Sequence, residues 1–285
     1  MTRRGPDPVD RLMLGFIVVF AGFLLFRIPQ VPDWPWLLAA DALVVLLALL
    51  ARRLPATGGV AEFLGGGYPL IIISAFYGQL GVMHSAVGHL NDGLVQRWEA
   101  AIFGTQVSVI WHQQMPSPVL SSVLHACYGA YYCVVALVPL WFWFRGDREA
   151  FRRAVFINTL ALVVCYLIFA AFPVAGPRYA FPLVTGPVVE NLPARFVSFM
   201  LGAASIGTAF PSSHVVAAWC AAYAAWRDAR RLALVLAPVV FLLALGTVYG
   251  QFHYAVDAVA GAVLAVALMA AADPLRRLLG RPARR

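Results

Sequence analysis

Long apolar stretches alternate with short polar segments along the 285 residues of the chain. A helix needs about 20 apolar residues to cross the hydrocarbon core of a bilayer, and stretches of this kind recur through the sequence. Eight of them are expected to form membrane-spanning helices: 12–29, 34–51, 60–83, 117–144, 152–173, 208–226, 231–249 and 254–272. The pattern therefore predicts an all-α fold, a polytopic membrane helical bundle of about eight transmembrane helices.

The segment 84–116 is too polar to span a bilayer, but it carries a helical pattern of its own. Its apolar side chains recur at helical spacing: Leu90, Leu94, Trp98, Ile102 and Phe103. We expect an amphipathic segment that lies at the membrane interface. The chain then divides into two N-terminal transmembrane helices, residues 1–59, and a six-helix core, residues 60–285, which includes this interfacial segment.

Composition agrees with a membrane protein, because 62% of the residues are hydrophobic and only 12% are charged. A soluble domain carries about 25% charged residues. The net charge is +8, and every basic residue is arginine. A basic protein can bind nucleic acid, but these arginines lie in short clusters between apolar stretches and form no basic patch within a polar surface. We therefore expect a membrane bilayer as the partner and no nucleic acid.

The arginines also predict the orientation of the chain. If the N-terminus is cytoplasmic, 17 of the 21 arginines fall on the cytoplasmic side, as the positive-inside rule requires. The exceptions are Arg27, Arg97, Arg178 and Arg195. We expect a multi-pass protein of the plasma or inner membrane with both termini in the cytoplasm. All six histidines then fall near the outer ends of spans: His84, His89, His112, His125, His214 and His253. This distribution predicts a polar site that faces outside.

Three motif-like stretches follow residue 170: FPVAGPRYAFP (172–182), FPSSHVV (210–216) and GTVYGQFHYAVDAVAG (246–261). In the third, His253 and Asp257 are four residues apart and would share one face of a helix. An aspartate in a membrane costs a few kcal/mol unless it is paired. Pairing would fix the tautomer of the imidazole and leave its other nitrogen free as a nucleophile.

The other two stretches supply groups that complement this pair. Ser212 and Ser213 stand at a helix start, where hydroxyls and free backbone N–H groups bind anions. His214 in the same turn can donate a proton to a leaving alkoxide. The guanidinium of Arg178 suits phosphate oxygens. Together these residues predict phosphoryl transfer through a phosphohistidine.

The three stretches resemble the signature motifs of the type 2 phosphatidic acid phosphatase superfamily, whose members have a six-helix membrane core. More narrowly, they resemble the branch that includes the inositol phosphorylceramide synthases. The similarity covers about residues 60–272, and its specific part is 172–261. By position, the resemblance implies His253 as nucleophile, Asp257 as its partner, His214 as the acid for the leaving group, and Arg178, Ser212 and Ser213 as phosphate ligands.

The sequence departs from the superfamily pattern at two cationic positions. The first motif has a lysine seven residues before its arginine and a proline after it, where this chain has Ala171 and Tyr179. The third motif begins Ser-Arg, where this chain has Gly246 and Thr247. A phosphodiester carries one charge fewer than a phosphomonoester and needs fewer cations, which favours the phosphotransferase branch.

We therefore expect a lipid phosphotransferase or phosphatase that acts on a phospholipid or lipid phosphate, with an alcohol or polyol as a possible acceptor and with no cofactor and no metal. Three alternatives remain for His253 and Asp257. They are a structural clamp between helices, a metal site shared with His214, and the proton relay of a proton-coupled transporter. Transporters often show internal repeats with paired broken helices, and this sequence has none. The remaining polar candidates, interpreted as interfacial residues or alternatively as the acceptor side of the site, are His84, His89, His112 and Asp92.

Overall fold

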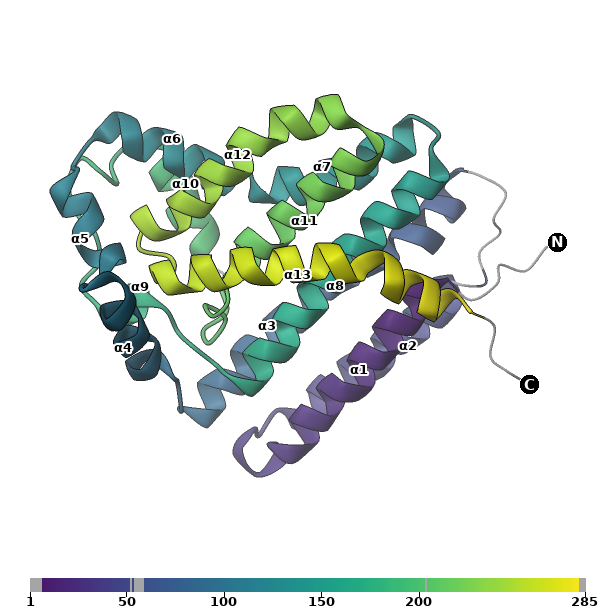
Figure 1. Cartoon of the computed structure of the whole chain (residues 1–285). Helices are drawn as coiled ribbons and strands as arrows, with labels where there is room; N and C mark the ends of the chain where they lie inside the picture. Colours follow the sequence, from purple (N-terminus) through teal and green to yellow (C-terminus); the bar gives the residue numbers. More distant parts are fainter. Residues whose placement is uncertain (1–6, 52, 54–58, 203, 282–285) are drawn as a thin grey trace.

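The computed structural model describes residues 7–51, 53, 59–202 and 204–281, and this part of the chain is helical with no β-strand (Figure 1). In chain order the helices are α1 (Pro8–Phe26), the 3-10 helix η1 (Ile28–Gln30), α2 (Trp34–Ala51), α3 (Gly59–Val87), α4 (Asp92–Phe103), α5 (Val107–Gln114), α6 (Pro118–Gly129), α7 (Tyr131–Phe144), α8 (Arg148–Ala171), α9 (Pro177–Ala180), α10 (Leu192–Leu201), α11 (Ser213–Asp228), α12 (Arg230–Tyr249) and α13 (Ala255–Gly280).

Six of the described helices are long and apolar enough to cross a membrane: α1, α2, α3, α8, α12 and α13. The pair α6 and α7, bent by 43° at Ala130, makes a seventh if it is counted as one span. These helices indicate a membrane-embedded protein and confirm the predicted all-α polytopic bundle.

The expected span 208–226 differs from the prediction, because its helix is α11, which begins only at Ser213 and has 16 residues. Proline lacks the N–H that a helix interior needs, so Pro211 falls before the helix. Ser212 then takes the N-cap position, where its side chain accepts the backbone N–H of Val215. The apolar pattern continued across residues 208–212, but the structure uses them as a loop.

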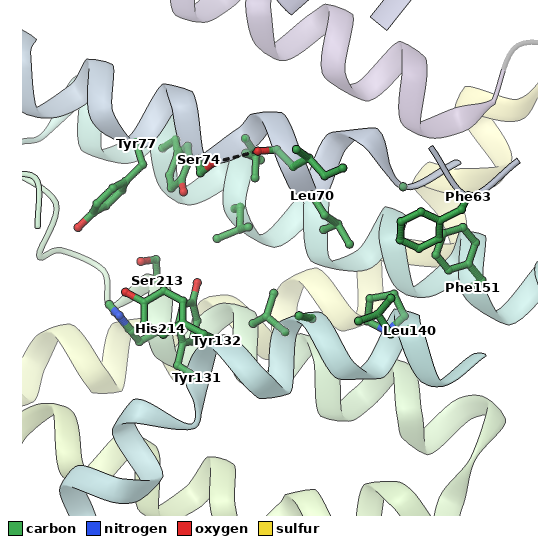
Figure 2. A pocket seen from close by; sticks show the side chains of 18 residues that line it. Phe63, Leu70, Ser74, Tyr77, Tyr131, Tyr132, Leu140, Phe151, Ser213 and His214 are labelled. Carbon is green, nitrogen blue, oxygen red and sulfur yellow. Dashed lines mark hydrogen bonds between the residues drawn. The ribbon is translucent and has the colours of Figure 1, made fainter. Parts of the chain in front are cut away.

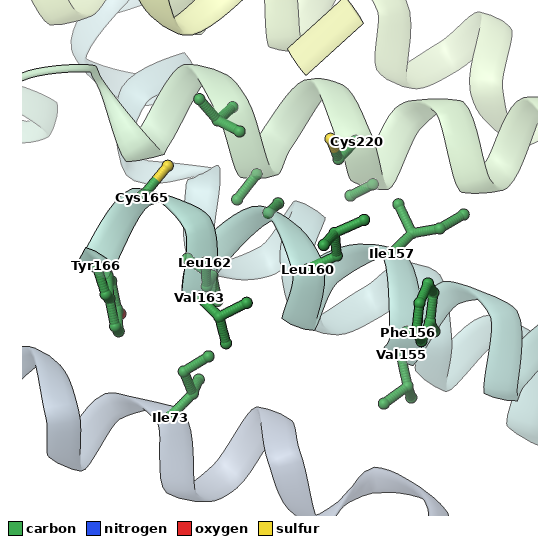
Figure 3. Packing of buried hydrophobic residues seen from close by; sticks show 14 of the residues in the cluster. Ile73, Val155, Phe156, Ile157, Leu160, Leu162, Val163, Cys165, Tyr166 and Cys220 are labelled. Atoms are coloured by element: carbon green, nitrogen blue, oxygen red, sulfur yellow. The ribbon is translucent and has the colours of Figure 1, made fainter. Parts of the chain in front are cut away.

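Helix α8 forms the centre of the bundle and contacts α1, α3, α7, α11 and α13. In the most apolar 18-residue stretch of α8, 78% of the residues are buried, whereas in that of α2 only 22% are buried. Figure 3 shows its side chains between α3, which contributes Ile73, and α11, which contributes Cys220. Small alanines on α11 permit this close approach: Ala217, Ala218, Ala221, Ala224 and Ala225.

Helices α1 and α2 pack at the periphery (Figure 1). The buried residues of α2 are only Leu37, Asp41 and Val44, so most of its leucines face outward, as expected for lipid-facing positions. Asp41 accepts a hydrogen bond of 2.9 Å from the side-chain amide of Gln79 in α3. This bond satisfies a carboxylate oxygen and ties α2 to α3.

The segment expected to lie at the interface begins later than predicted, because α3 continues to Val87 and includes His84. The rest of the segment forms α4 and α5, and Gly104 ends α4 in a left-handed conformation with φ of 72°. Together with α9, these helices lie at the end of the bundle opposite the start of α1 and the end of α13 (Figure 1).

Candidate active site

Backbone hydrogen bonds join the three motif-like stretches. Val174 and Thr208 form an isolated parallel β-bridge, in which the N–H of Ala209 donates to the carbonyl of Val174 at 2.9 Å. The N–H of Ser212 donates to the backbone carbonyl of Asp257 at 3.0 Å. The first stretch is therefore paired with the second, and the second with the third.

His253 lies in the loop before α13, one residue ahead of the N-cap Tyr254. Its Nδ1 lies 2.9 Å from the carbonyl oxygen of Ala209 and 3.6 Å from Oδ2 of Asp257. A carbonyl oxygen only accepts, so Nδ1 carries the proton and Nε2 has a free lone pair. The spacing of His253 and Asp257 predicts that they share one helix and that the aspartate fixes the tautomer of the imidazole. In the structure His253 precedes the helix, and the nearer partner is a backbone carbonyl.

Asp257 is fully buried in the first turn of α13. Its Oδ2 accepts the backbone N–H of Tyr254 at 2.9 Å and so caps the helix. Its Oδ1 is buried and has no hydrogen-bond partner in the described part of the chain. Oδ2 thus caps the helix and also lies within ion-pair distance of Nδ1 of His253.

His214 lies in the first turn of α11, and its ring meets that of His253 edge-on with centroids 5.6 Å apart. Its Nε2 lies 3.2 Å from the hydroxyl of Tyr128. The ring of Tyr131 is 4.4 Å away between centroids. Tyr128 was not among the predicted site residues, because it is one of many aromatic residues in apolar helices and has no motif around it.

Ser212 and Ser213 are both buried at the start of α11. The hydroxyl oxygen of Ser212 lies 3.5 Å from the backbone nitrogen of Val215, as an N-cap side chain does. Capping and anion binding use the same end of the helix, and the two roles are compatible.

A small cavity of about 40 Å³, which we call the histidine cavity, lies between the two imidazoles and α9. Its polar lining residues are Tyr77, Tyr128, Arg178, Tyr179, Ser205, Thr208, His214 and His253. The guanidinium of Arg178 forms no hydrogen bond or ion pair with any described residue. The fold thus brings a free cation and two imidazoles to the wall of one cavity.

Asp92 holds the first motif-like stretch in place. Its Oδ2 accepts the backbone N–H of Ala175 and its Oδ1 that of Gly176, each at 2.8 Å. Its Oδ1 also lies 3.1 Å from the hydroxyl of Tyr254, which donates to it. Because Arg178 follows two residues after Gly176, Asp92 fixes the backbone that carries this arginine.

A second carboxylate, that of the fully buried Glu99, performs a similar role beside the third stretch. Its Oε1 accepts the N–H of Val107 at 3.1 Å, and its Oε2 accepts the N–H of Val256 at 2.9 Å. It thereby joins α4 to α5 and to the start of α13. The hydrogen bonds of Asp92 and Glu99 could not be predicted from the sequence, because their backbone donors lie in other elements.

The remaining histidines of the sequence analysis do not line the histidine cavity. His84 is buried in α3, and its Nδ1 contacts the carbonyl of Ile206 at 3.0 Å. His112 is buried in α5, and this burial lowers the pKa of its imidazole. His89 lies between α3 and α4.

An apolar groove of about 410 Å³ runs between α3 and α7 over α8, as Figure 2 shows. Phe63 and Phe151 lie at one end, and Ser213 and His214 lie at the other. Its walls between these ends are mostly aliphatic, with Leu70, Ile73 and Leu140 among them. The groove therefore connects an apolar part of the bundle with the candidate acid His214.

The alternative metal site would need three ligands close together. The described residues contain no group of three His, Cys, Asp or Glu side chains that could hold a metal ion.

The three motif-like stretches bring four of the predicted site residues together beside the start of α11: His214, His253, Asp257 and Arg178.

The sequence profile of the PAP2 superfamily matches residues 94–271, more than half of the chain, and this range contains all three motif-like stretches. No curated protein and no solved structure matches the chain. Because this profile matches more than half of the chain, the chain belongs to the PAP2 superfamily, that of the type 2 phosphatidic acid phosphatases.

Proposed function

We propose that this protein is an integral membrane lipid phosphotransferase or phosphatase that acts on a phospholipid or lipid phosphate through a phosphohistidine. Membership of the PAP2 superfamily supports a phosphatase- or phosphotransferase-type activity in general. The observation that carries the lipid assignment is the apolar groove, whose end is formed by Ser213 and His214. A hydrocarbon chain in this groove would hold its phosphate beside the two histidines.

The first step is attack by Nε2 of His253 on phosphorus. The N–P bond forms as the P–O bond to the leaving alcohol breaks, and His214 transfers a proton to that oxygen. Arg178 binds the non-bridging phosphate oxygens, and the start of α11 supports them with Ser212 and Ser213. The phosphorylated ring of His253 is cationic because Nδ1 keeps its proton, and the Asp257 carboxylate at 3.6 Å stabilises this charge.

The second step restores the enzyme. Water or an alcohol attacks phosphorus, the N–P bond breaks, and the proton of the attacking hydroxyl goes to His214. If the substrate is a lipid phosphate, His253 carries an unsubstituted phosphoryl group, and water yields free phosphate and makes the protein a phosphatase. If the donor is a phosphodiester lipid, His253 carries a phosphoryl group that is still esterified, and a polyol or sphingoid alcohol yields a new phosphodiester and makes the protein a phosphotransferase.

The charge of the site supports the inositol phosphorylceramide synthase-like branch. Among the described residues that line the histidine cavity, Arg178 is the only permanent cation. The two further cations of the superfamily motifs are replaced by Ala171 and Thr247. A phosphodiester monoanion fits a single guanidinium better than a phosphomonoester dianion does.

We further propose that the site faces outside, with both termini in the cytoplasm of a cell with a plasma or inner membrane. The arginine distribution supports this orientation. The end of α13 lies beside α1, where Arg11 donates a hydrogen bond to the carbonyl of Leu279, whereas His253 precedes the start of α13. Residues 1–59 would then add two helices to a core formed by residues 60–285.

The test uses purified protein in detergent with a panel of lipid phosphates and phospholipids, with and without alcohol acceptors. Free phosphate and new phospholipid are followed together for wild type, His253→Ala and the control His89→Ala, which lies outside the cavity. We expect one product in wild type and the control, and none in His253→Ala. If no lipid is converted by wild type, the proposal fails and the transporter alternative is tested by uptake.

A further inference from the structure

A buried tyrosine of α6 contacts the ring of the candidate acid. Tyr128 is 4% exposed, and its hydroxyl lies 3.2 Å from Nε2 of His214. We propose that Tyr128 is a positioning residue that keeps a proton on Nε2 of His214, so that Nδ1 alone exchanges the proton of the reaction. This inference rests on the proposed function, because it assigns the atoms of the acid step in that mechanism.

The hydroxyl of Tyr128 has no competing partner. Among the described residues, His214 is the only one that shares a hydrogen bond with it. By contrast, the hydroxyl of the buried Tyr249 donates to the backbone carbonyl of Met115 at 2.8 Å, which is a bond that serves the fold. The hydroxyl of Tyr128 is therefore tied to an imidazole and not to the backbone.

Aromatic packing holds Tyr128 against His214. The two rings stack with centroids 4.8 Å apart and planes inclined by 26°, and the ring of Phe252 lies 4.5 Å from that of Tyr128 between centroids. Gly246 of α12 permits the close approach of α6, since a Cβ there would lie 2.5 Å from the carbonyl oxygen of Leu124. The position of the hydroxyl is thus fixed by the packing of α6 against α11 and α12.

The two ring nitrogens of His214 have different surroundings. Nε2 faces the hydroxyl of Tyr128, whereas Nδ1 is buried and has no hydrogen-bond partner among the described residues. A hydroxyl oxygen can accept an N–H, so Tyr128 can hold the proton on Nε2 both in the cationic and in the neutral ring. Nδ1 is then the nitrogen that gives up a proton or takes one. Because His214 lines the histidine cavity and the apolar groove, this exchange takes place where the two meet.

The cycle moves one proton through Nδ1. In the first step the imidazolium of His214 gives its Nδ1 proton to the oxygen of the leaving alcohol, while the P–O bond breaks and the N–P bond to His253 forms. The ring of His214 is then neutral, with its remaining proton on Nε2 beside Tyr128. In the second step Nδ1 takes the proton of the attacking water or alcohol as the N–P bond breaks, and the imidazolium is restored. The opposite tautomer would leave Nδ1 protonated and unable to accept.

The kinetic test compares two phosphate esters that differ only in their leaving group. One is the lipid ester that wild type converts best, and the other is its analogue in which para-nitrophenol replaces the leaving alcohol. An alkoxide needs a proton as it leaves, whereas para-nitrophenolate leaves without an acid. Tyr128→Phe keeps the ring and removes the hydroxyl. We expect single-turnover release of the leaving group to slow about tenfold for the lipid ester and less than about twofold for the para-nitrophenyl ester.

Two further variants calibrate this comparison. His214→Gln is the reference and should slow release from the lipid ester by about 10²- to 10⁴-fold, with a much smaller effect on the para-nitrophenyl ester. The matched control is Tyr249→Phe, which also removes a buried tyrosine hydroxyl but lies outside both cavities, and it should leave both rates near wild type. Equal losses for both esters in Tyr128→Phe would mean that the hydroxyl serves the fold alone. That result overturns the proposal, and so does an unchanged rate for the lipid ester.

The tautomer is measured without turnover, by NMR of purified protein with ¹⁵N-labelled histidine rings, in which His214→Gln identifies the resonances of this ring. Above neutral pH we expect a proton on Nε2 and none on Nδ1 in wild type and Tyr249→Phe, and a mixture of both tautomers in Tyr128→Phe. A proton on Nδ1 in wild type, or an unchanged tautomer in Tyr128→Phe, overturns the proposal even if lipid is converted. If the tautomer responds as expected but no lipid ester is converted, the assignment of Nε2 to Tyr128 stands and only the proposed function fails.

Discussion

The imidazole Nδ1 of His253 lies 2.9 Å from the carbonyl oxygen of Ala209, in the loop before α11. The Asp257 carboxylate is farther away, at 3.6 Å, and its Oδ2 already accepts the backbone N–H of Tyr254. A backbone carbonyl thus holds the protonated nitrogen and leaves Nε2 for the proposed attack on phosphorus. In the proposed mechanism the aspartate contributes charge more than orientation.

This division of roles predicts a moderate effect of Asp257→Asn. The asparagine keeps an oxygen for the N–H of Tyr254 but loses the charge that stabilises a cationic phosphohistidine. Where a carboxylate alone sets the tautomer, its loss costs about 10⁴-fold in kcat. Because Ala209 keeps the tautomer, we expect a decrease in kcat of about 10- to 100-fold, measured by rapid quench with a labelled lipid. His253→Gln is the reference variant and should abolish the reaction, and an equally complete loss in Asp257→Asn would contradict the assigned role.

Asp92 is predicted to act as a positioning residue for Arg178. Asp92→Ala removes the acceptor of two backbone N–H groups, those of Ala175 and Gly176. We expect the free energy of unfolding to fall by about 1–2 kcal/mol, because Asp92 is only half-buried and water can replace part of the loss. KM should rise more than kcat falls, because the loop that carries Arg178, the proposed phosphate ligand, is no longer held.

Two further variants separate positioning from stability. Tyr254→Phe removes only the hydroxyl that donates to Asp92 and should have a smaller effect on both quantities. Asp92→Asn retains one acceptor and should recover part of the loss in KM. A variant that unfolds at a lower temperature with an unchanged KM would mean that Asp92 serves the fold alone.

The long apolar helices were predictable from the sequence because each depends on a local apolar run, and the structure confirms a polytopic all-α bundle. The short helices α9 and α10 were not predicted, and the expected span 117–144 is the bent pair α6 and α7. The start of α11 was not placed correctly, since hydropathy does not register the backbone preference of Pro211 and Ser212. The motif spacing indicated which residues gather at the site, because each motif is short and continuous.

The contacts that hold those motifs could not be predicted. The partner of His253 is a backbone carbonyl 44 residues away, and a carbonyl has no identity in the sequence. Asp92 and Glu99 were indistinguishable from other polar residues of an interfacial segment, because their backbone donors lie 83 and 157 residues away in the chain. Such long-range contacts follow from how the helices pack, which apolar periodicity does not encode.

Gly207 is predicted to be intolerant of a side chain. Its φ is +83°, and a Cβ built on it would lie 2.1 Å from Nδ1 of the buried His84. Gly207→Ala therefore combines backbone strain, of about 1 kcal/mol or more, with displacement of His84. Because Gly207 accepts the N–H of Val174 in the bridge between the first two motifs, we expect lower thermal stability and lower kcat. Gly186→Ala is the control, since its φ is +82° but nothing lies within 4 Å, and it should show the strain alone. Equal effects in both variants would argue against the clash.

The apolar groove is predicted to select substrates by chain length. Ala136 of α7 lines the groove, whereas its neighbour Leu137 is 57% exposed and does not line it. Ala136→Trp fills part of the groove and should displace about two methylene groups of a long hydrocarbon chain, each of which contributes about 0.8 kcal/mol on burial. We expect KM for a long-chain lipid substrate to rise about tenfold, with little change for a short-chain analogue. Leu137→Trp adds the same side chain outside the groove and should leave both KM values near wild type. If Ala136→Trp affects short and long chains alike, the indole perturbs His214 and not a chain, and the groove is not the binding site for the hydrocarbon.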